Sequence, residues 1–504
     1  MTVSLLLEMA ESADPDRIAV VSDDSRVTVR ELAEFASCAG ARLAGSGAGH
    51  VAYVGTGGLM LPLLLFASAR AGLPFTPLNY RLGEDALREL IGRLPNPVVV
   101  ADSEYAESCQ DSGWEVLESA DFLASPRAEV GGPVTDVAPD DVAVVLFTSG
   151  TTSRPKAVEL THANLTSYVM GTVDFASAAP DDAVLICVPP YHIAGVGAAL
   201  SNLYAGRKMV YQRRFDPVDW LDLVEAEAVT NATVVPTMLD RIVAELDARP
   251  RPLPSLRTLA YGGAKVALPL VRRTLDLLPS VGLVNAYGLT ETSSTIAVLG
   301  PEDHRAACGS DDPVVARRLG SVGRVVPGVE AEIRNAAGTV VQAGERGELF
   351  IRGPQVSGRY SEIGSVLDSD GWFPTRDVAT VDSDGYLYIG GRSDDTIIRG
   401  GENIAPAEIE DVLVEHPDVR AVAVVGVDDD EWGQVIAAVV VLRDETGADA
   451  EDLRSFVRSR LRGSRTPDRV VFRSDLPTTP TGKLLRRVLV DELRSTATEQ
   501  QRST

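Results

Sequence analysis

The sequence predicts an α/β protein with a large N-terminal body of mainly parallel sheets flanked by helices, a β-rich subdomain, and a small mobile α+β C-terminal lobe. Two observations carry this prediction. Short apolar runs alternate with amphipathic, helix-like stretches over most of the chain, which is typical of parallel sheets covered by helices. After about Val329 the pattern changes to short strands separated by polar turns rich in Gly and Asp.

The predicted strands of the body are apolar runs with the length of a buried strand. They are Val51–Val54, Val98–Ala101, Val142–Phe147, Val184–Val188, Thr233–Val235 and Val281–Val284. The intervening segments place apolar residues at helical spacing, as in Pro217–Ala228 and Pro269–Leu278. The richest apolar run extends from Leu59 to Ala69, but its length predicts a core helix rather than a membrane span.

Three short segments, Val329–Arg334, Glu348–Arg352 and Tyr386–Ile389, predict the strands of the β-rich subdomain. Beyond them the chain forms a self-contained pattern of ordinary domain size. This pattern has a helix over 406–416, strands over 419–425 and 436–442, and a helix over 450–461. We therefore expect a body over residues 1–391, a C-terminal lobe over 394–504 and a hinge near 392–395.

The composition limits which classes of partner the protein can bind. The chain has 504 residues, 45% of them hydrophobic, and a net charge of −25. Such a charge argues against nucleic acid and against an anionic membrane, because either would be repelled. The N-terminus has no basic leader, and four cysteines (Cys38, Cys109, Cys187 and Cys308) show no disulfide or zinc spacing. These features favour a reducing cytoplasm.

A hydroxyl-rich loop follows the predicted strand Val142–Phe147. Its residues are Thr148, Ser149, Gly150, Thr151, Thr152, Ser153, Arg154, Pro155 and Lys156. Glycine lets a backbone approach closely, hydroxyl and N–H groups donate to phosphate oxygens, and lysine supplies positive charge. The spacing is not that of a Walker loop, in which Gly, Lys and Ser or Thr are adjacent. The loop therefore predicts a phosphate site, with a polar surface loop as the alternative.

Five further segments stand in a fixed order along the chain. They are Asn285–Thr292, Gly371–Asp377, Gly391–Asp395, Arg399–Asn403 and Pro480–Lys483. Together with the hydroxyl-rich loop, they resemble the motifs of the adenylate-forming superfamily of acyl-CoA synthetases, luciferases and peptide-synthetase adenylation domains. The resemblance covers essentially the whole chain.

The resemblance implies a site for ATP and Mg²⁺. The 148–156 loop would hold the β- and γ-phosphates, and Tyr287 would lie against the adenine face. Asp377 would accept hydrogen bonds from the ribose hydroxyls, and Arg392 would support the ribose and phosphate end. Glu291 would hold Mg²⁺, a hard cation that prefers carboxylate oxygen. Each of these residues also has a structural alternative, such as a core tyrosine or a surface ion pair.

The resemblance also implies the moving parts. Lys483, on the tail of the small lobe, would reach the α-phosphate and neutralise the charge that builds there as a substrate carboxylate attacks. Asp394 matches the hinge about which the small lobe turns between the adenylating and acyl-transfer arrangements. The loop from Arg399 to Asn403 would then line the channel of the acceptor.

The sequence departs from the family pattern at several positions. Ser153 and Ala157 stand where the family usually has glycine, so we expect a slightly altered phosphate loop. The usual Thr-Gly-Asp appears as Thr375-Arg376-Asp377. In the small lobe, Arg465-Thr466-Pro467 replaces the Tyr-Lys-x-Pro that is frequent in CoA-using relatives, which leaves CoA binding open.

The acyl pocket should be lined by mostly apolar or small residues, among them His192, Met238, Gly262, Gly263 and Ala264. His192 would close the pocket, stack on an aromatic acid, or simply pack. Lys265 is the nearest fixed charge, with unknown direction. No acidic residue stands ready for a substrate ammonium, so we expect a neutral aromatic or aliphatic carboxylic acid.

The predicted reaction is therefore the ATP-dependent activation of a small carboxylic acid as acyl-AMP, with release of pyrophosphate. The acyl group would then pass to an amine, as in an amide bond synthetase, or to the thiol of coenzyme A. The residues leave both acceptors open. We expect no attached carrier domain, and the intact Glu291, Asp377 and Lys483 oppose a nucleotide-binding protein without turnover.

Overall fold

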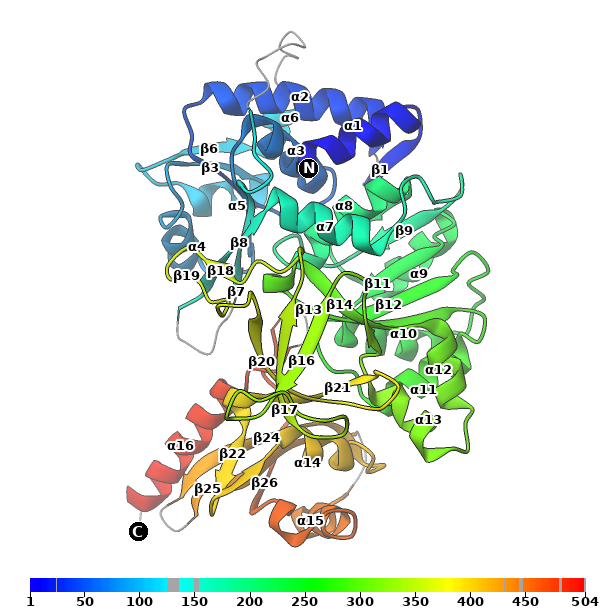
Figure 1. Ribbon diagram of the computed structural model, residues 1–504, viewed down its shortest axis with the longest axis vertical. Coiled ribbons are helices and arrows are strands. Elements are labelled where there is room, and N and C mark those ends of the chain that lie inside the picture. Colours follow the sequence, from blue (N-terminus) through cyan, green and yellow to red (C-terminus); the bar gives the residue numbers. More distant parts are fainter. Residues whose placement is uncertain are drawn as a thin grey trace.

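The computed structural model contains a large body and a small C-terminal lobe, with the chain's C-terminus at the far end of the lobe (Figure 1). It describes residues 1–502 except 24, 125–135, 149–153, 430–431, 444–446 and 480–482, with backbone alone over 495–502. In the described part of the chain, the strands form four sheets. Two sheets build the body, one the β-rich subdomain, and one the lobe.

The first sheet of the body has a parallel centre and antiparallel edges. Its order is β15 (Arg324–Val325), β14 (Ser294–Leu299), β13 (Gly282–Leu289), β12 (Thr258–Gly262), β11 (Asn231–Val234), β9 (Ala183–Ile186), β10 (Lys208–Tyr211), β1 (Ile18–Ser22) and β2 (Ser25–Thr28). The strands from β13 to β1 run parallel, so their carboxyl ends lie along one edge. In open α/β sheets that edge is where ligands bind.

The second sheet is parallel on one side and antiparallel on the other. Its order is β19 (Gly364–Ser365), β18 (Arg359–Tyr360), β8 (Lys156–Thr161), β7 (Val142–Thr148), β4 (Phe75–Leu78), β3 (His50–Val54), β5 (Pro97–Ala101) and β6 (Glu115–Glu118). The antiparallel pair β7–β8 flanks the predicted phosphate loop on both sides.

Helices cover the faces of these two sheets. They are α1 (Val3–Ala13), α2 (Val29–Gly45), α3 (Met60–Ala71), α4 (Glu84–Ile91), α5 (Ser103–Ala106), α6 (Ser119–Ala124), α7 (His162–Thr172), α8 (Ile193–Ala205), α9 (Pro217–Ala226), α10 (Pro236–Ala248), α11 (Leu268–Leu277), α12 (Pro301–Cys308) and α13 (Pro313–Arg317). Helix α3 packs on β3 and β4, α8 packs on β9 and β10, and the two helices contact each other. Every residue of α3 except Arg70 is buried, as its apolar sequence predicts.

The β-rich subdomain is an antiparallel sheet in the order β16 (Glu330–Arg334), β17 (Gly347–Arg352), β20 (Phe373–Val381) and β21 (Leu387–Arg392). In the lobe, β23 (Glu402–Ile404), β22 (Ile397–Arg399), β25 (Gly433–Leu442) and β24 (Val419–Asp429) pair in that order, and β26 (Arg469–Phe472) adds to β25. Helices α14 (Pro406–Leu413), α15 (Ala450–Arg458) and α16 (Arg486–Arg502) complete it. The lobe buries one cluster on each face of its sheet.

The predicted elements are present, with different ends. Helix α14 stops at Leu413 rather than at 416, because Pro417 disfavours helical backbone before it. Helix α15 ends at Arg458 rather than at 461, and β24 and β25 are longer than predicted. The third predicted strand of the subdomain lies later, as β21. All four cysteines are free thiols.

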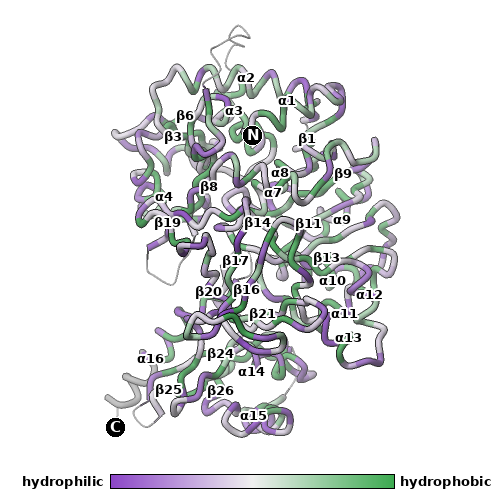
Figure 2. Tube along the Cα trace, in the orientation of Figure 1, coloured by the Kyte–Doolittle hydropathy of each residue, from purple (hydrophilic) through white to green (hydrophobic). Residues whose placement is uncertain are grey.

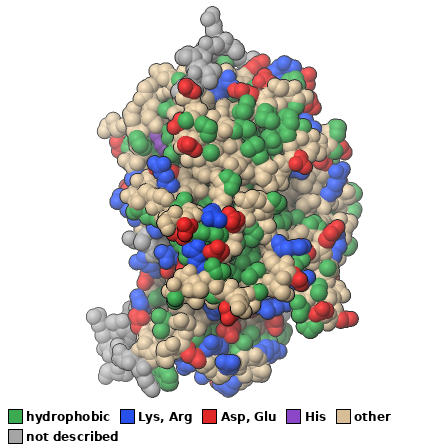
Figure 3. Space-filling view, in the orientation of Figure 1, with side chains coloured by type: hydrophobic (Ala, Val, Ile, Leu, Met, Phe, Trp, Pro, Cys, Tyr) green, Lys and Arg blue, Asp and Glu red, His purple; other side chains and the backbone are tan. Residues whose placement is uncertain are grey.

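Hydrophobic stretches follow the strands and inner helices, while polar residues follow the loops (Figure 2). On the face shown in Figure 3, acidic and basic side chains are interspersed rather than gathered by sign. Among the residues that the structure describes, no helix is long and apolar enough to cross a membrane.

Candidate active site

The ends of the predicted phosphate loop face each other across the β7–β8 hairpin. Thr148 pairs with Lys156, and its hydroxyl donates to the Lys156 carbonyl oxygen at 3.4 Å. Ser149, Gly150, Thr151, Thr152 and Ser153 lie outside the described residues. Ala157 is buried in β8 opposite Phe147 without a positive φ, so alanine suits the backbone where the family usually has glycine.

Tyr287, Asp377 and Arg392 form one hydrogen-bonded group. Strand pairing sets Asp377 of β20 directly opposite Arg392 of β21. The Tyr287 hydroxyl donates to Asp377 Oδ2 at 2.5 Å, and Arg392 Nη1 donates to Asp377 Oδ1 at 3.1 Å. Arg392 Nη1 also donates to the Thr375 carbonyl oxygen. The structure therefore brings together three residues from three separate motifs.

Burial controls the protonation of this group. Asp377 is only 5% exposed. Desolvation raises the pKa of Tyr287 well above its ordinary value, and the adjacent Asp377 carboxylate raises it further, so the phenol remains a donor. Desolvation works to lower the pKa of Arg392, but Asp377 outweighs it and the pKa is raised. The group thus holds one carboxylate and one permanent cation.

Glu291 lies in the short 3₁₀ turn Thr290–Thr292 that follows β13. Its carbonyl oxygen accepts from the Ser357 backbone N–H at 2.9 Å, and its carboxylate Oε1 accepts from the Tyr360 hydroxyl at 2.8 Å. The Lys156 ammonium lies 5.5 Å from the centroid of the Tyr360 ring. Tyr360 therefore connects the predicted metal ligand to the end of the phosphate loop.

Lys483 makes its described hydrogen bonds within the tail of the lobe. Its N–H donates to the Thr479 hydroxyl at 3.0 Å, and its carbonyl oxygen accepts from the Thr479 N–H at 2.7 Å. Although the residue as a whole is exposed, desolvation of its ammonium lowers its pKa. The Arg392 charge lowers the pKa further, while Asp377, Asp395 and Glu291 oppose both effects. Charged groups of the body motifs therefore influence the ammonium of the tail lysine.

The predicted hinge is a short 3₁₀ turn, Ser393–Asp395, between β21 and β22. Asp394 is exposed, whereas Asp395 faces inward. Asp395 pairs with Arg486 at 3.3 Å, and Arg486 also donates to Glu410 Oε1 at 2.5 Å and Oε2 at 2.9 Å. Desolvation raises the pKa of the Asp395 carboxyl despite the neighbouring cations. Asp394 therefore lies between β21 of the body and the ion pair that Asp395 makes with Arg486.

The residues of the predicted acyl pocket follow the carboxyl ends of adjacent parallel strands. His192 follows β9 and precedes α8, Met238 lies in α10 after β11, and Gly262 ends β12. A Cβ at Gly262 would stand 2.2 Å from the Ala286 carbonyl oxygen, so a side chain cannot fit there. Gly263 has φ +82°, a value that favours glycine, and Ala264 follows it.

The imidazole of His192 is held neutral. Burial, aided by the charge of Arg81, lowers its pKa to about 4. Its ring lies 4.5 Å from the ring of Tyr191, which in turn meets Tyr80 at 5.7 Å. Neither His192 Nε2 nor the Tyr191 hydroxyl has a hydrogen-bond partner within the described residues, and both atoms are buried. The predicted pocket therefore has an aromatic wall rather than a charged one.

The direction of Lys265 was left open by the sequence. Its ammonium lies 2.6 Å from both carboxylate oxygens of Asp411 in α14 of the lobe. It therefore bridges the body and the lobe.

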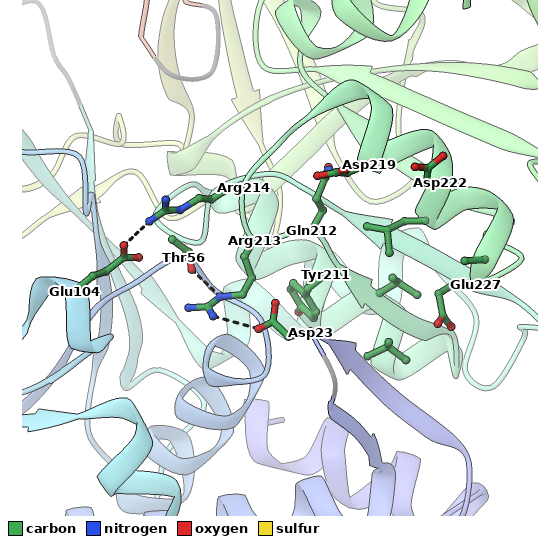
Figure 4. A pocket seen from close by; sticks show the side chains of 14 residues that line it. Asp23, Thr56, Glu104, Tyr211, Gln212, Arg213, Arg214, Asp219, Asp222 and Glu227 are labelled. Carbon is green, nitrogen blue, oxygen red and sulfur yellow. Dashed lines mark hydrogen bonds and ion pairs between the residues drawn. The ribbon is translucent and has the colours of Figure 1, made fainter. Parts of the chain in front are cut away.

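A cavity of about 670 Å³ lies elsewhere in the body, at the ends of β1 and β10 beside α9 (Figure 4). Its two arginines are held by carboxylates: Arg213 contacts Asp23 at 3.2 Å and Asp102 at 2.6 Å, and Arg214 contacts Glu104. None of the predicted nucleotide residues that the structure describes lines it. We do not assign the reaction to this cavity.

Sequence reasoning missed three residues of the site, which are Tyr360, Asp395 and Arg486. Their partners come from distant segments, since Tyr360 is 69 positions from Glu291 and Arg486 is 76 from Glu410. The signal for Asp395 was present, because it lies within the hinge predicted near 392–395, although no role was assigned to it. For Tyr360 and Arg486 only the tertiary contacts reveal the role.

Comparisons with known proteins identify the family of the chain. The chain matches the AMP-binding enzyme family over residues 7–361 and the AMP-binding enzyme C-terminal domain over 408–483. It is 38% identical to a feruloyl-CoA synthase of an Amycolatopsis species, covering 89% of this chain and 88% of that protein.

Two solved structures share the whole fold. The amide bond synthetase McbA of Marinactinospora thermotolerans superposes with a TM-score of 0.87 at 29% identity, covering 97% of this chain and 99% of that one. The o-succinylbenzoate CoA synthetase of Bacillus subtilis, solved with its acyl-adenylate intermediate, has a TM-score of 0.84 at 28% identity, covering 96% and 97%. The latter enzyme has also been solved with ATP and a magnesium ion. The chain belongs to the AMP-binding enzyme family and is the AMP-forming ligase that its motifs predict.

Proposed function

We propose that the protein activates an apolar, aromatic carboxylic acid with ATP and transfers the acyl group to the thiol of coenzyme A. The observation that carries the first half is the hydrogen-bonded group of Tyr287, Asp377 and Arg392, which joins three of the motifs. The charges of Asp377 and Arg392 also act on the pKa of Lys483. In this proposal, residues 1–391 form the adenylation body, and residues 394–504 form the lobe that turns about 392–395.

The nucleotide would lie along the carboxyl ends of the parallel strands. Tyr287 packs against the adenine, and Asp377 exchanges its contacts with Tyr287 and Arg392 for hydrogen bonds from the ribose hydroxyls. Thr148 and Lys156 mark the end where the β- and γ-phosphates sit. The Asp377 carboxylate, the Arg392 guanidinium and the Lys156 ammonium thus match the donors and acceptors of ATP along its length.

The residues present fit a magnesium ion. No group of three or more His, Cys, Asp or Glu side chains that could hold a metal occurs in the described ranges, but Mg²⁺ is usually held by one or two carboxylates together with substrate phosphates. Glu291 offers such a carboxylate, steadied by Tyr360. When bound, the ion would neutralise phosphate charge.

Lys483 would stabilise the transition state of adenylation. As a carboxylate oxygen of the acid attacks the α-phosphorus, the bond from that phosphorus to the pyrophosphate oxygen breaks. Negative charge then builds on the α-phosphate oxygens. Because the Lys483 ammonium would already be desolvated when this charge builds, it would stabilise the transition state more than the ground state.

Replacing Tyr360 with phenylalanine is expected to weaken the activation by Mg²⁺ about tenfold, because Glu291 loses the hydrogen bond that orients its carboxylate. The magnesium dependence of acid-stimulated pyrophosphate release measures this effect. Tyr386→Phe, which removes a hydroxyl bonded to Asp303 instead, is the matched control. An unchanged magnesium dependence in Tyr360→Phe would exclude the role.

The acyl pocket supports an aromatic acid. Its walls are the neutral His192, the ring of Tyr191, and Met238, followed by the small residues 262–264. Lys265, the fixed charge that adjoins residues 262–264, is engaged by Asp411. The similarity to enzymes named for feruloyl and succinylbenzoyl substrates also favours an aryl acid.

We propose the acceptor of the acyl group from the names of the similar proteins. Several similar curated proteins are named as CoA ligases or CoA synthases, which favours the thiol. A second candidate is an amine, because McbA shares the whole fold and because Arg465-Thr466-Pro467 departs from the usual CoA pattern. Arg465 is engaged by Glu402 and Glu408 within the lobe.

One experiment tests both halves. The purified protein is incubated with ATP, Mg²⁺ and a panel of aryl and aliphatic acids, with CoA or with a simple amine. Acid-dependent pyrophosphate release is expected, together with the mass of an aryl-CoA thioester. An amide as the principal product would replace the thiol proposal by the amine. No acid-dependent pyrophosphate release across the panel would contradict the activation step.

A further inference from the structure

Lys483 lies on a short arm of the lobe. Two segments, 477–479 and 483–485, run antiparallel to each other, and we call them the lysine arm. Thr478 and Leu484 form a bridge between the two segments, and two backbone hydrogen bonds, of 2.7 and 2.8 Å, flank that bridge. These bonds set the conformation of the arm but not its direction, which depends on the contacts that hold its base.

The residue that follows the lysine arm is Arg486, which begins helix α16. The first turn of this helix contains no acidic residue and starts with two arginines, Arg486 and Arg487. The N-terminus of a helix carries a partial positive charge, so arginine at this place opposes helix formation. Contacts outside the helix must therefore outweigh this cost, and Arg486 makes such contacts.

Glu410 of α14 and Val424 of β24 hold Arg486 within the lobe. Arg486 donates from Nη1 to Glu410 Oε1 at 2.5 Å and from Nη2 to Glu410 Oε2 at 2.9 Å. Nη1 also donates to the Val424 carbonyl oxygen at 2.6 Å, and the Val424 N–H donates to Glu410 Oε1 at 2.7 Å. A two-point contact between guanidinium and carboxylate fixes the plane of the arginine, whose side chain is only 21% exposed. The base of the lysine arm is therefore attached to the sheet of the lobe.

The remaining nitrogen of Arg486 reaches the hinge. Its Nε lies 3.3 Å from Asp395 Oδ2, and Asp395 ends the turn Ser393–Asp395 directly after the predicted hinge residue Asp394. Desolvation works to lower the pKa of Arg486, but Glu410 and Asp395 outweigh it and the pKa is raised. Arg486 is thus a permanent cation that links the hinge turn to the base of the lysine arm.

This link limits which part of the chain can turn. The lobe is held in register from β22 onward by pairing with β23 and β25, and the ion pair extends that order back to Asp395. Asp394 is then free to turn, while the lysine arm keeps its direction relative to the hinge. Direction matters because a misplacement of about 1 Å can cost a catalytic group much of its effect.

We propose that Asp395 and Arg486 are positioning residues for adenylation: their ion pair holds the base of the lysine arm against the hinge, so that Lys483 enters the site in one direction. The inference rests on the proposed function, which gives Lys483 its role at the α-phosphate. Both residues act through Lys483 and make no contact with the substrate.

The test compares Asp395→Asn and Arg486→Gln with the wild-type protein in the two half-reactions. Single-turnover formation of acyl-AMP is expected to slow about fivefold in Asp395→Asn and about tenfold or more in Arg486→Gln. The KM for ATP should stay unchanged, because the nucleotide contacts remain. Conversion of supplied acyl-AMP to the acyl-CoA thioester should keep its rate, because this step does not use Lys483. Arg486→Lys, which keeps the cation but not the two-point contact, should adenylate faster than Arg486→Gln and slower than the wild type.

Two measurements separate positioning from a general loss of stability. Hydrogen–deuterium exchange of the backbone amides in 477–485 should be faster in Asp395→Asn, whereas the amides of β25 should exchange at the wild-type rate. Glu492→Gln is the matched control, because it removes an acidic partner of Arg473 from the same helix α16. It should leave exchange in the lysine arm and both half-reactions unchanged.

Wild-type rates of acyl-AMP formation in both Asp395→Asn and Arg486→Gln would overturn the inference. An equal loss of both half-reactions would also overturn it, because that result indicates a general effect on the fold. If Arg486→Gln does not fold because Glu410 loses its partner, Asp395→Asn still decides, since it leaves the contact with Glu410 in place.

The exchange measurement keeps the inference separable from the proposed function, because it requires no turnover. A wild-type protein that releases no pyrophosphate with any acid would contradict the proposed function. Unchanged exchange of the lysine arm in Asp395→Asn would contradict the inference alone.

Discussion

Replacing Lys483 with alanine is expected to lower acyl-adenylate formation by roughly 100-fold or more while the fold remains intact, because the α-phosphate loses the cation that stabilises its transition state. Lys483 makes its described hydrogen bonds through the backbone, and alanine can keep these. Single-turnover formation of acyl-AMP, followed by quenching and mass spectrometry, measures the effect.

Lys208→Ala is the matched control, since this lysine pairs with Glu227 and does not approach the site. It should retain adenylation. Undiminished pyrophosphate release by Lys483→Ala would exclude the proposed role. The KM for ATP should change less than kcat, because the interaction is made chiefly in the transition state.

The lowered pKa of Lys483 adds a pH dependence. The active form is the ammonium, which is lost as the pH rises through the lowered pKa. The kcat/KM for adenylation should therefore decline at a pH below 10.5, the ordinary pKa of lysine. Lys483→Arg, which does not titrate in this range, should lack that decline.

Replacing Asp394 with proline is expected to abolish acyl transfer and to spare adenylation. The residue lies in a 3₁₀ turn, whose φ is close to that of proline, so the present arrangement of the lobe can persist. Rotation of the lobe requires the backbone here to change, and the proline ring prevents much of that change. Separate single-turnover assays of acyl-AMP formation and of its conversion to product measure the two steps.

Asp394→Ala removes the same carboxylate without restricting the backbone and should therefore perform both steps. The ion pair between Lys265 and Asp411 must also break if the lobe turns, so Asp411→Asn should not impair transfer. Equal loss of both steps in Asp394→Pro, with normal steps in Asp394→Ala, would place the effect on the site rather than on the rotation.

Much of the fold could be predicted because the signals are local. The apolar runs that became β3, β5, β7, β9 and β13, and the core helix α3, depend on the periodicity of neighbouring residues. Helix ends were less predictable. In α14, predicted through residue 416, the helix ends at Leu413 before Pro417.

Residues of the candidate site could be predicted only where they stand in a recognisable motif. Tyr287, Glu291, Asp377, Arg392 and Lys483 stand in recognisable segments, and hydrogen bonds join Tyr287, Asp377 and Arg392. The roles of Glu291 and Lys483 stay predictions. Tyr360 stands in no motif that the sequence analysis used, and its role follows from the pairing of β18 with β8. The loop residues 149–153 lie outside the described residues, so their phosphate contacts remain a prediction.

By itself the sequence determined the α/β class, the order of the motifs and the identity of the charged groups, because these depend on residue type and spacing along the chain. Only the tertiary structure decided which charges meet: Tyr360 with Glu291, Lys265 with Asp411, and Arg486 with Glu410. It also decided that Arg376 occupies a left-handed conformation. Contacts between distant segments and the backbone angles of a strand irregularity arise from packing, which spacing along the chain does not encode.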